Sequence, residues 1–128
     1  MSRSGKKDKP PHRLQWVVEP IMEEPSYLQK SMFGCQACYL NGRLVLALSS
    51  GEEPWNGLLI PTDHLYQASI RADFEEVRQH PLLKKWLYLP EASEDFETTA
   101  VSIVEAIGRK DARFGVELRP KPPARKKR

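Results

Sequence analysis

Long apolar runs are absent from this sequence of 128 residues. No stretch of about 18 consecutive apolar residues occurs, so the sequence predicts no transmembrane helix. Residues 1–13 also lack the apolar segment that a secretory signal needs. We therefore expect a cytoplasmic protein that has no membrane partner.

Cysteine is scarce, with two residues in the chain. Cys35 and Cys38 form a Cys-x-x-Cys pair, but a redox pair of this kind normally stands at the start of a helix. Here it lies in a predicted strand, which puts the Cα atoms roughly 10 Å apart with the side chains on opposite faces. A disulfide needs less than about 7 Å, and a zinc site needs further ligands. We expect two small strand residues and no cofactor, with Cys35, Cys38 and His64 as weak metal candidates.

Catalytic signatures are also missing. His12, His64 and His80 do not cluster in the sequence, and a catalytic triad needs a nucleophile, a base and an orienting group within reach of one another. Thr62-Asp63-His64 is either a fragment of a site or a loop with a helix cap, and we favour the cap. Ser49-Ser50-Gly51 lacks the motif and the lysine of a phosphate-binding loop. We therefore predict no catalytic residues.

Positive charge is concentrated at the two ends. The net charge is +3, and residues 1–13 carry +4 and residues 119–128 carry +6, so residues 14–118 carry −7. We predict two disordered basic tails around a single domain at 14–118. Basic tails either contact nucleic acid or only add solubility. The candidate nucleic-acid contacts are Lys121, Arg125, Lys126, Lys127 and Arg128.

What the sequence does contain is a strong hairpin signal in residues 32–48. Asn41-Gly42 is the preferred pair for a type I′ turn, in which both central residues have positive φ. A two-residue loop predicts cross-strand pairs Leu40–Arg43, Tyr39–Leu44, Ala37–Leu46 and Cys35–Leu48. Paired residues share a face. One face would then carry Cys35, Ala37, Tyr39, Leu44, Leu46 and Leu48, and the other a mixed set that includes Cys38, Leu40 and Val45.

Further strands follow from short apolar segments between turn residues. We predict extended chain over residues 26–31 and strands in residues 55–62 and 113–118. Residues 82–89 indicate either a short strand from Trp86 to Pro90 or a helical turn through Lys84 and Lys85. Three Trp and four Tyr are available mainly for core or interface packing, with base stacking as the alternative.

Three helices are predicted. A short one lies near Pro20, because proline suits a first helical turn. A second runs over residues 74–79 with Asp73 as its N-cap. The third begins at Ser93 and ends at Ile107, before Gly108. Its apolar residues recur with a 3.6-residue period: Phe96, Ala100, Ile103, Val104 and Ile107.

These features together resemble the N-terminal domain of TfoX-like proteins. The resemblance rests on Met32-Phe33-Gly34, on Tyr39 to Arg43 and the strand after it, and on Leu87 to Glu91 followed by an amphipathic helix. It covers about residues 28–108. It departs from the family at Cys35, where a second glycine is usual, and in the proline-broken segment before the motif. The resemblance implies a small α+β domain and a role in regulating competence for DNA uptake, with no established catalytic residues.

The expected fold class is α+β, with an antiparallel sheet of about five strands and helices mainly on one face. The expected function is a non-enzymatic regulatory or adaptor module of the TfoX N-terminal type that acts through a protein partner or as a homodimer. The alternative is a small ligand-binding domain or enzyme that uses the loop Pro61–Tyr66 and the strand that holds Cys35 and Cys38.

Overall fold

The computed structural model of the chain describes residues 12–32 and 34–117. Within these ranges the fold is α+β, as predicted, and its antiparallel sheet contains seven strands where about five were expected. The path through the sheet is β1-β2-β3-β4-β6-β5, and β7 pairs with the start of β3. The strands are β1 (Leu28–Met32), β2 (Cys35–Leu40), β3 (Arg43–Ser50), β4 (Asn56–Pro61), β5 (Arg78–Gln79), β6 (Trp86–Pro90) and β7 (Val116–Glu117).

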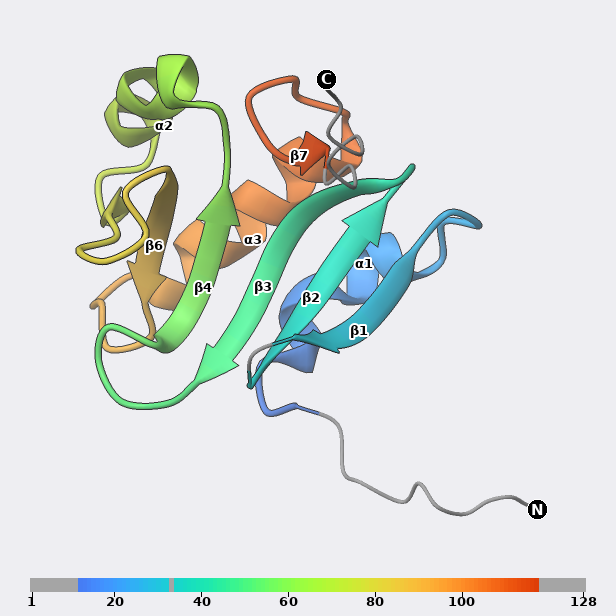
Figure 1. Cartoon of the computed structure of the whole chain (residues 1–128), viewed down its shortest axis with the longest axis horizontal. Helices are drawn as coiled ribbons and strands as arrows, with labels where there is room; N and C mark the ends of the chain where they lie inside the picture. Colours follow the sequence, from blue (N-terminus) through green and yellow to red (C-terminus); the bar gives the residue numbers. More distant parts are fainter. Residues whose placement is uncertain (1–11, 33, 118–128) are drawn as a thin grey trace, which may run out of the picture.

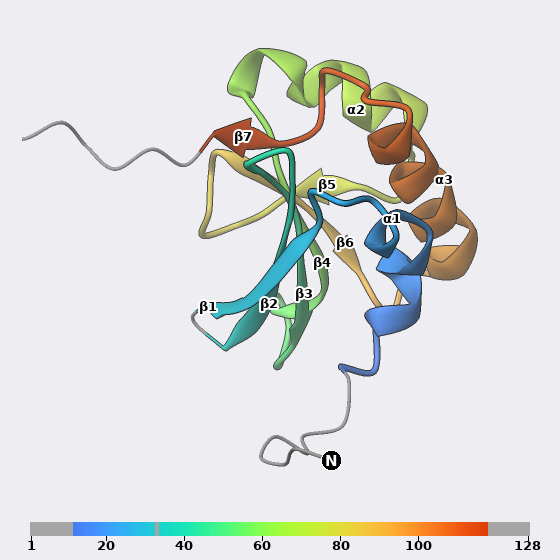
Figure 2. The same ribbon diagram turned by 90° about the vertical axis from the view of Figure 1, so that its right-hand side faces the viewer.

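The helices gather on one side of this sheet. Helices α1 (Glu19–Met22) and α3 (Phe96–Gly108) lie behind it in Figure 1, together with the 3-10 turn η2 (Gln15–Val18). Figure 2 shows the same arrangement from the side. The turn η3 (His64–Tyr66) and helix α2 (Gln67–Asp73) lie at one end of the sheet. We call the side that packs on α1 and α3 the helix-covered face, and the other side the open face.

The predicted hairpin is confirmed at its turn. Asn41 and Gly42 have φ values of 53° and 78°, so both adopt the positive φ that a type I′ turn requires. The pairs Leu40–Arg43 and Tyr39–Leu44 also form as predicted. The turn therefore joins β2 and β3 where the sequence placed it.

Farther from the turn, the predicted register is wrong. Cys38 pairs with Leu46 and Ala37 with Ala47, because the register shifts next to Tyr39 and leaves Val45 as an extra residue in β3. Such a β-bulge sets two residues of one strand against one of its partner. As a result, Leu46 and Leu48 lie on the helix-covered face, and the open face receives Leu44 and Ala47.

The main core fills the space between the helix-covered face and the helices. Its strand residues include Leu46, Leu48 and Ile60, none of which has any exposed surface. Helix α3 contributes the periodic residues that were predicted to share a face: Phe96, Ala100, Ile103, Val104 and Ile107. The amphipathic pattern of this helix is thereby confirmed.

Two predicted helix starts are wrong. Asp73 is the last residue of α2 and does not cap a helix at 74–79, since Arg78 and Gln79 pair with β6. Pairing along the free edge of β6 outweighs the local capping signal. Helix α3 begins at Phe96 with Asp95 as its N-cap, and the Ser93 hydroxyl is buried without a hydrogen-bond partner among the described residues.

Several other local predictions are confirmed over the described residues, but Asp63 precedes η3 without making the side-chain hydrogen bond of a helix cap. Pro20 lies in the first turn of α1, and the extended segment before the hairpin is strand β1. Trp86 to Pro90 forms a strand, which was one of the two alternatives for this segment; the other was a helical turn through Lys84 and Lys85. Strand β7 lies inside the predicted segment 113–118. The predicted tails lie largely outside the described residues, and so do the five candidate nucleic-acid contacts.

Candidate functional site: an apolar groove on the open face

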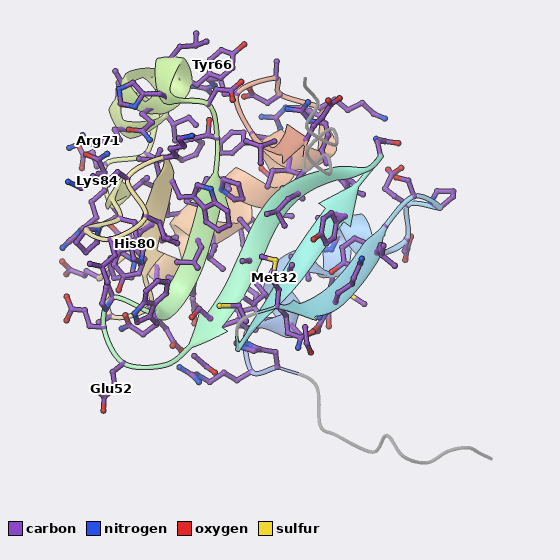
Figure 3. The ribbon with its side chains drawn as sticks, viewed as in Figure 1. Met32, Glu52, Tyr66, Arg71, His80 and Lys84 are labelled. Atoms are coloured by element: carbon purple, nitrogen blue, oxygen red, sulfur yellow. The ribbon has the colours of Figure 1, made fainter. Side chains whose placement is uncertain are left out.

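The open face of the sheet holds a groove with a volume of about 1060 Å³. Strands β2, β3 and β4 form its floor through Cys35, Leu44, Ala47 and Leu59. Two loops form its walls, one between β3 and β4 and the other between β5 and β6. The further lining residues are Met32, Gly34, Ser49, Gly51, Trp55, Leu82, Leu83, Lys84, Lys85 and Trp86. In Figure 3, Met32 lies over the middle of the sheet and Lys84 lies to the left of β4.

The first wall is the loop from Gly51 to Trp55. The Gly51 amide donates to the Trp55 carbonyl at 2.7 Å, and the Trp55 amide donates to the Glu52 carbonyl at 2.6 Å. The hydroxyl of Ser49, at the end of β3, also donates to the Trp55 carbonyl. These bonds fold the loop back on itself and hold the indole of Trp55 at the groove.

The second wall is the segment from His80 to Trp86. The His80 backbone amide donates to the Trp86 carbonyl at 3.1 Å, and the Trp86 amide donates to the Leu83 carbonyl at 2.9 Å. The Lys84 carbonyl accepts the side-chain amides of Gln79 at 2.7 Å and Gln67 at 3.3 Å. This wall is therefore held by its own backbone and by two glutamine side chains.

His80 joins the two walls. Its Nδ1 accepts the backbone amides of Leu82 at 3.0 Å and Leu83 at 2.9 Å. With Nδ1 accepting, the proton belongs on Nε2, which donates to the Pro54 carbonyl in the first wall at 3.1 Å. The His80 ring also packs against Trp55, with 4.5 Å between ring centroids.

The environment of His80 favours its neutral form. The residue has no exposed surface, and burial lowers the pKa of its imidazole, although the hydrogen bond to Pro54 acts in the opposite direction. Protonation of Nδ1 would also remove the acceptor for two amides at once. The connection between the walls is therefore strongest when His80 is neutral.

The two cysteines lie on opposite faces, as the strand geometry predicted. Cys35 belongs to the cluster on the open face, and Cys38 belongs to the main core. Burial raises the pKa of the Cys38 thiol to about 11, while its hydrogen bond with Tyr27 lowers it. Cys38 is thus a poor nucleophile or ligand, and Cys35 is the cysteine that lines the groove.

The loop Pro61–Tyr66 lies elsewhere. Asp63 and Tyr66 line a separate hollow of about 380 Å³, together with polar residues of the hairpin turn and of the segment after α3. Cys35 and Cys38 are not among the lining residues of that hollow. His64 is exposed in η3. The structure therefore does not bring this loop and the cysteines into one site.

The described lining of the groove is poor in titratable groups. Within residues 12–32 and 34–117, no three His, Cys, Asp or Glu side chains are grouped so that they could hold a metal ion. The described residues that line the groove include no carboxylate and no imidazole, and their titratable side chains are those of Cys35, Lys84 and Lys85.

None of the helices in the described part of the chain has the length and apolar character needed to cross a membrane. Comparisons with protein-family models, with curated proteins and with solved structures found no match.

Sequence reasoning identifies Cys35 as a candidate residue but misses most of the other groove residues. It assigns Trp55 and Trp86 to core or interface packing, and it considers Leu82-Leu83-Lys84-Lys85 only as secondary structure. The available signal is the apolar pair Leu82-Leu83 directly after Pro81, which marks a turn. Leu82 is in fact 64% exposed.

Proposed function

We propose that this protein is a non-enzymatic binding module and that its apolar groove is the site that receives a ligand. The observation that supports this proposal is the groove itself, which has a volume of about 1060 Å³. It lies on a face of the sheet that no helix of the described residues covers. Ligand pockets commonly have volumes of about 300–1,000 Å³ and mostly apolar walls. The groove is slightly larger than the upper limit of this range.

The preformed walls support this proposal. Hydrogen bonds within each loop hold Trp55 and Leu83 in place, and His80 connects the two loops. A site that is already ordered loses little conformational entropy when a ligand enters. Burial of apolar ligand surface against the floor and the two indoles supplies the favourable free energy.

The resemblance to the TfoX N-terminal domain supports a regulatory role for such a module. In this role, a ligand in the groove would control how the protein contacts its partner. Such control is a form of the adaptor function predicted from the sequence. A homodimer and nucleic-acid binding through the basic tails stay predictions. The sequence analysis considered an adaptor module and a small ligand-binding domain. The groove supports ligand binding more directly, and it replaces the loop Pro61–Tyr66 as the proposed binding site.

Two exposed leucines offer a matched test. Leu82 is 64% exposed and lines the groove, whereas Leu65 is 74% exposed in η3 and does not line it. We expect the neutral apolar dye Nile red to bind saturably, one molecule per chain. Leu82→Asp should weaken this binding strongly, and Leu65→Asp should leave it unchanged. Absence of saturable binding, or equal weakening in both variants, would contradict the proposal.

A further inference from the structure

We propose that the ligand of the groove is a small single-chain amphiphile with an anionic head group, whose apolar chain lies between the two walls and whose head meets Lys84 and Lys85. This inference rests on the proposed function, since it names the class of ligand for the same site. Three observations support it, and they concern the charge of the lining, the backbone that holds the lysines and the apolar surface of the walls.

The first observation is the charge of the lining. Lys84 and Lys85 are the only charged residues among the described residues that line the groove. Both are exposed, as expected for a site at the rim. The nearest acidic residues of the opposite wall, Glu52 and Glu53, are not part of the lining. Figure 3 shows Glu52 at the bottom of the view, well below Lys84. An anionic group at the rim would therefore meet two cations.

The second observation is the way the lysine pair is positioned. Two glutamine amides, from Gln67 in α2 and Gln79 in β5, donate to the Lys84 carbonyl. Gln67 is itself buried, with 6% of its surface exposed. Exposed lysines on a mobile loop would need no such support. Here the backbone at Lys84 is held at the rim, so less conformational entropy is lost when an anionic group binds there.

The third observation concerns the apolar surface that a ligand can contact. Leu44 and Ala47 have no exposed surface, and Leu59 has 2%, so these three floor residues are already covered. The accessible apolar lining comes from the two walls, where Leu82 is exposed and Trp55, Leu83 and Trp86 are partly exposed. A polar peptide backbone would find few hydrogen-bond partners between these side chains. A single alkyl chain between the walls would bury their apolar surface without leaving a polar group unpaired.

Three compounds with the same chain of twelve carbons test the head group. Dodecanoate is anionic, 1-dodecanol is neutral and dodecyltrimethylammonium is cationic. Each is titrated into the full chain below its micelle concentration at pH 8, and tryptophan fluorescence reports binding because Trp55 and Trp86 line the groove. We expect dodecanoate to bind at least about tenfold more tightly than the cation, with the alcohol between them.

A second test reverses the charge of the two lysines. The double variant Lys84→Glu/Lys85→Glu should weaken dodecanoate binding by roughly tenfold or more and should strengthen binding of the cation. The control Lys30→Glu/Lys110→Glu makes the same change in net charge at exposed lysines outside the groove lining, and should leave both affinities unchanged.

The possible results separate the two proposals. If all three compounds bind equally and Leu82→Asp weakens each of them, the groove is a binding site but its ligand is not selected by charge, so the present inference fails. If the lysine control weakens dodecanoate as much as the groove variant does, the inference also fails. If no compound binds and Nile red does not bind, both proposals fall.

Discussion

The two faces of one sheet differ in how they are completed. Helices α1 and α3 fill the helix-covered face with side chains, whereas on the open face two loops rise around a hollow of about 1060 Å³. The charged residues differ as well. Those within α1 and α3 are Glu19, Glu97 and Glu105, whereas those of the described groove lining are Lys84 and Lys85. One side therefore holds the main core, and the other holds the groove.

The bulge at Val45 makes this difference possible. Because Val45 and Leu46 both belong to the main core, β3 presents two successive residues to the helices and then resumes its alternation. Large residues consequently pack under α3, and the small side chain of Ala47 is left on the floor of the groove. Without the bulge, Leu46 and Leu48 would occupy the groove.

The largest expected effect is Gly57→Ala, which would damage both faces together. Gly57 has a φ of +141°, and a Cβ atom there would lie 2.2 Å from the Leu89 carbonyl oxygen and 2.7 Å from the Glu91 nitrogen. These atoms are backbone, so β4 and β6 must separate. We expect the free energy of unfolding, measured with urea, to fall by about 4 kcal/mol or more.

Gly34→Ala is the matched control for this change. Gly34 also has a positive φ, of 80°, but a Cβ atom there would meet nothing within 4 Å. Only backbone strain is added, so the expected loss is about 1 kcal/mol. If both variants lost the same free energy of unfolding, the close approach of β4 and β6 would not explain the effect of Gly57→Ala.

Leucine truncation should distinguish the faces. Leu46→Ala empties a fully buried position under the helices and should cost about 3 kcal/mol in the free energy of unfolding. Leu59→Ala removes a side chain from the smaller cluster next to the groove and should cost about 2 kcal/mol, because the groove leaves fewer neighbours around it. Urea denaturation of both variants checks the difference, and a larger cost at Leu59 would mean that the open face is packed as densely as the core.

The sequence was sufficient for the features that depend on local chemistry. Asn41-Gly42 forms the turn because both residues tolerate positive φ, and the periodic residues of α3 face the sheet because 3.6-residue spacing puts them on one side. The bulge was not predictable in this way. Both residues at the shift are ordinary strand residues, and the extra residue is selected by packing between β3 and the helices.

The groove was also beyond sequence reasoning, because it depends on contacts between distant segments. His80 and Pro54 are 26 positions apart in sequence, and nothing local indicates that their loops meet. The same holds for Gln67, which supports Lys84 from a different element. Residue types could indicate apolar and basic character there, but not that these residues surround a single hollow.

Protonation of His80 should weaken the walls and the fold in acid. Its pKa is lowered in the folded protein, so the unfolded chain binds the proton more readily. The resulting stabilisation is fully present above the unfolded pKa of about 6.5 and is lost as the pH falls through the folded value. We expect the free energy of unfolding and Nile red affinity to decrease together below pH 6.5.

Two histidine variants identify the source of this pH dependence. Burial and the nearby Arg13 lower the pKa of His12 as well, against the opposing charge of Glu91, so His12 contributes to stability with the same sign. His12→Gln should therefore reduce the pH dependence of unfolding but preserve that of dye binding. His80→Gln should abolish the pH dependence of dye binding and cost about 2 kcal/mol at pH 8. If dye binding retained its acid sensitivity in His80→Gln, the two walls would not be connected through this residue.

The smallest expected effect is chemical, and it compares the faces through the two cysteines of β2. Cys38 has no exposed surface under the helices, and its thiol has a pKa raised by burial to about 11, so both access and thiolate formation are suppressed. Cys35 is 8% exposed and lines the groove. At pH 7.5, N-ethylmaleimide should therefore modify the Cys38→Ser protein at least about tenfold faster than the Cys35→Ser protein. Dodecanoate should slow the reaction of Cys35 alone, since a chain between the walls of the groove would shield the exposed part of that residue and leave the opposite face unchanged. Equal rates, or protection of Cys38, would show that the two faces are not separated as the structure describes.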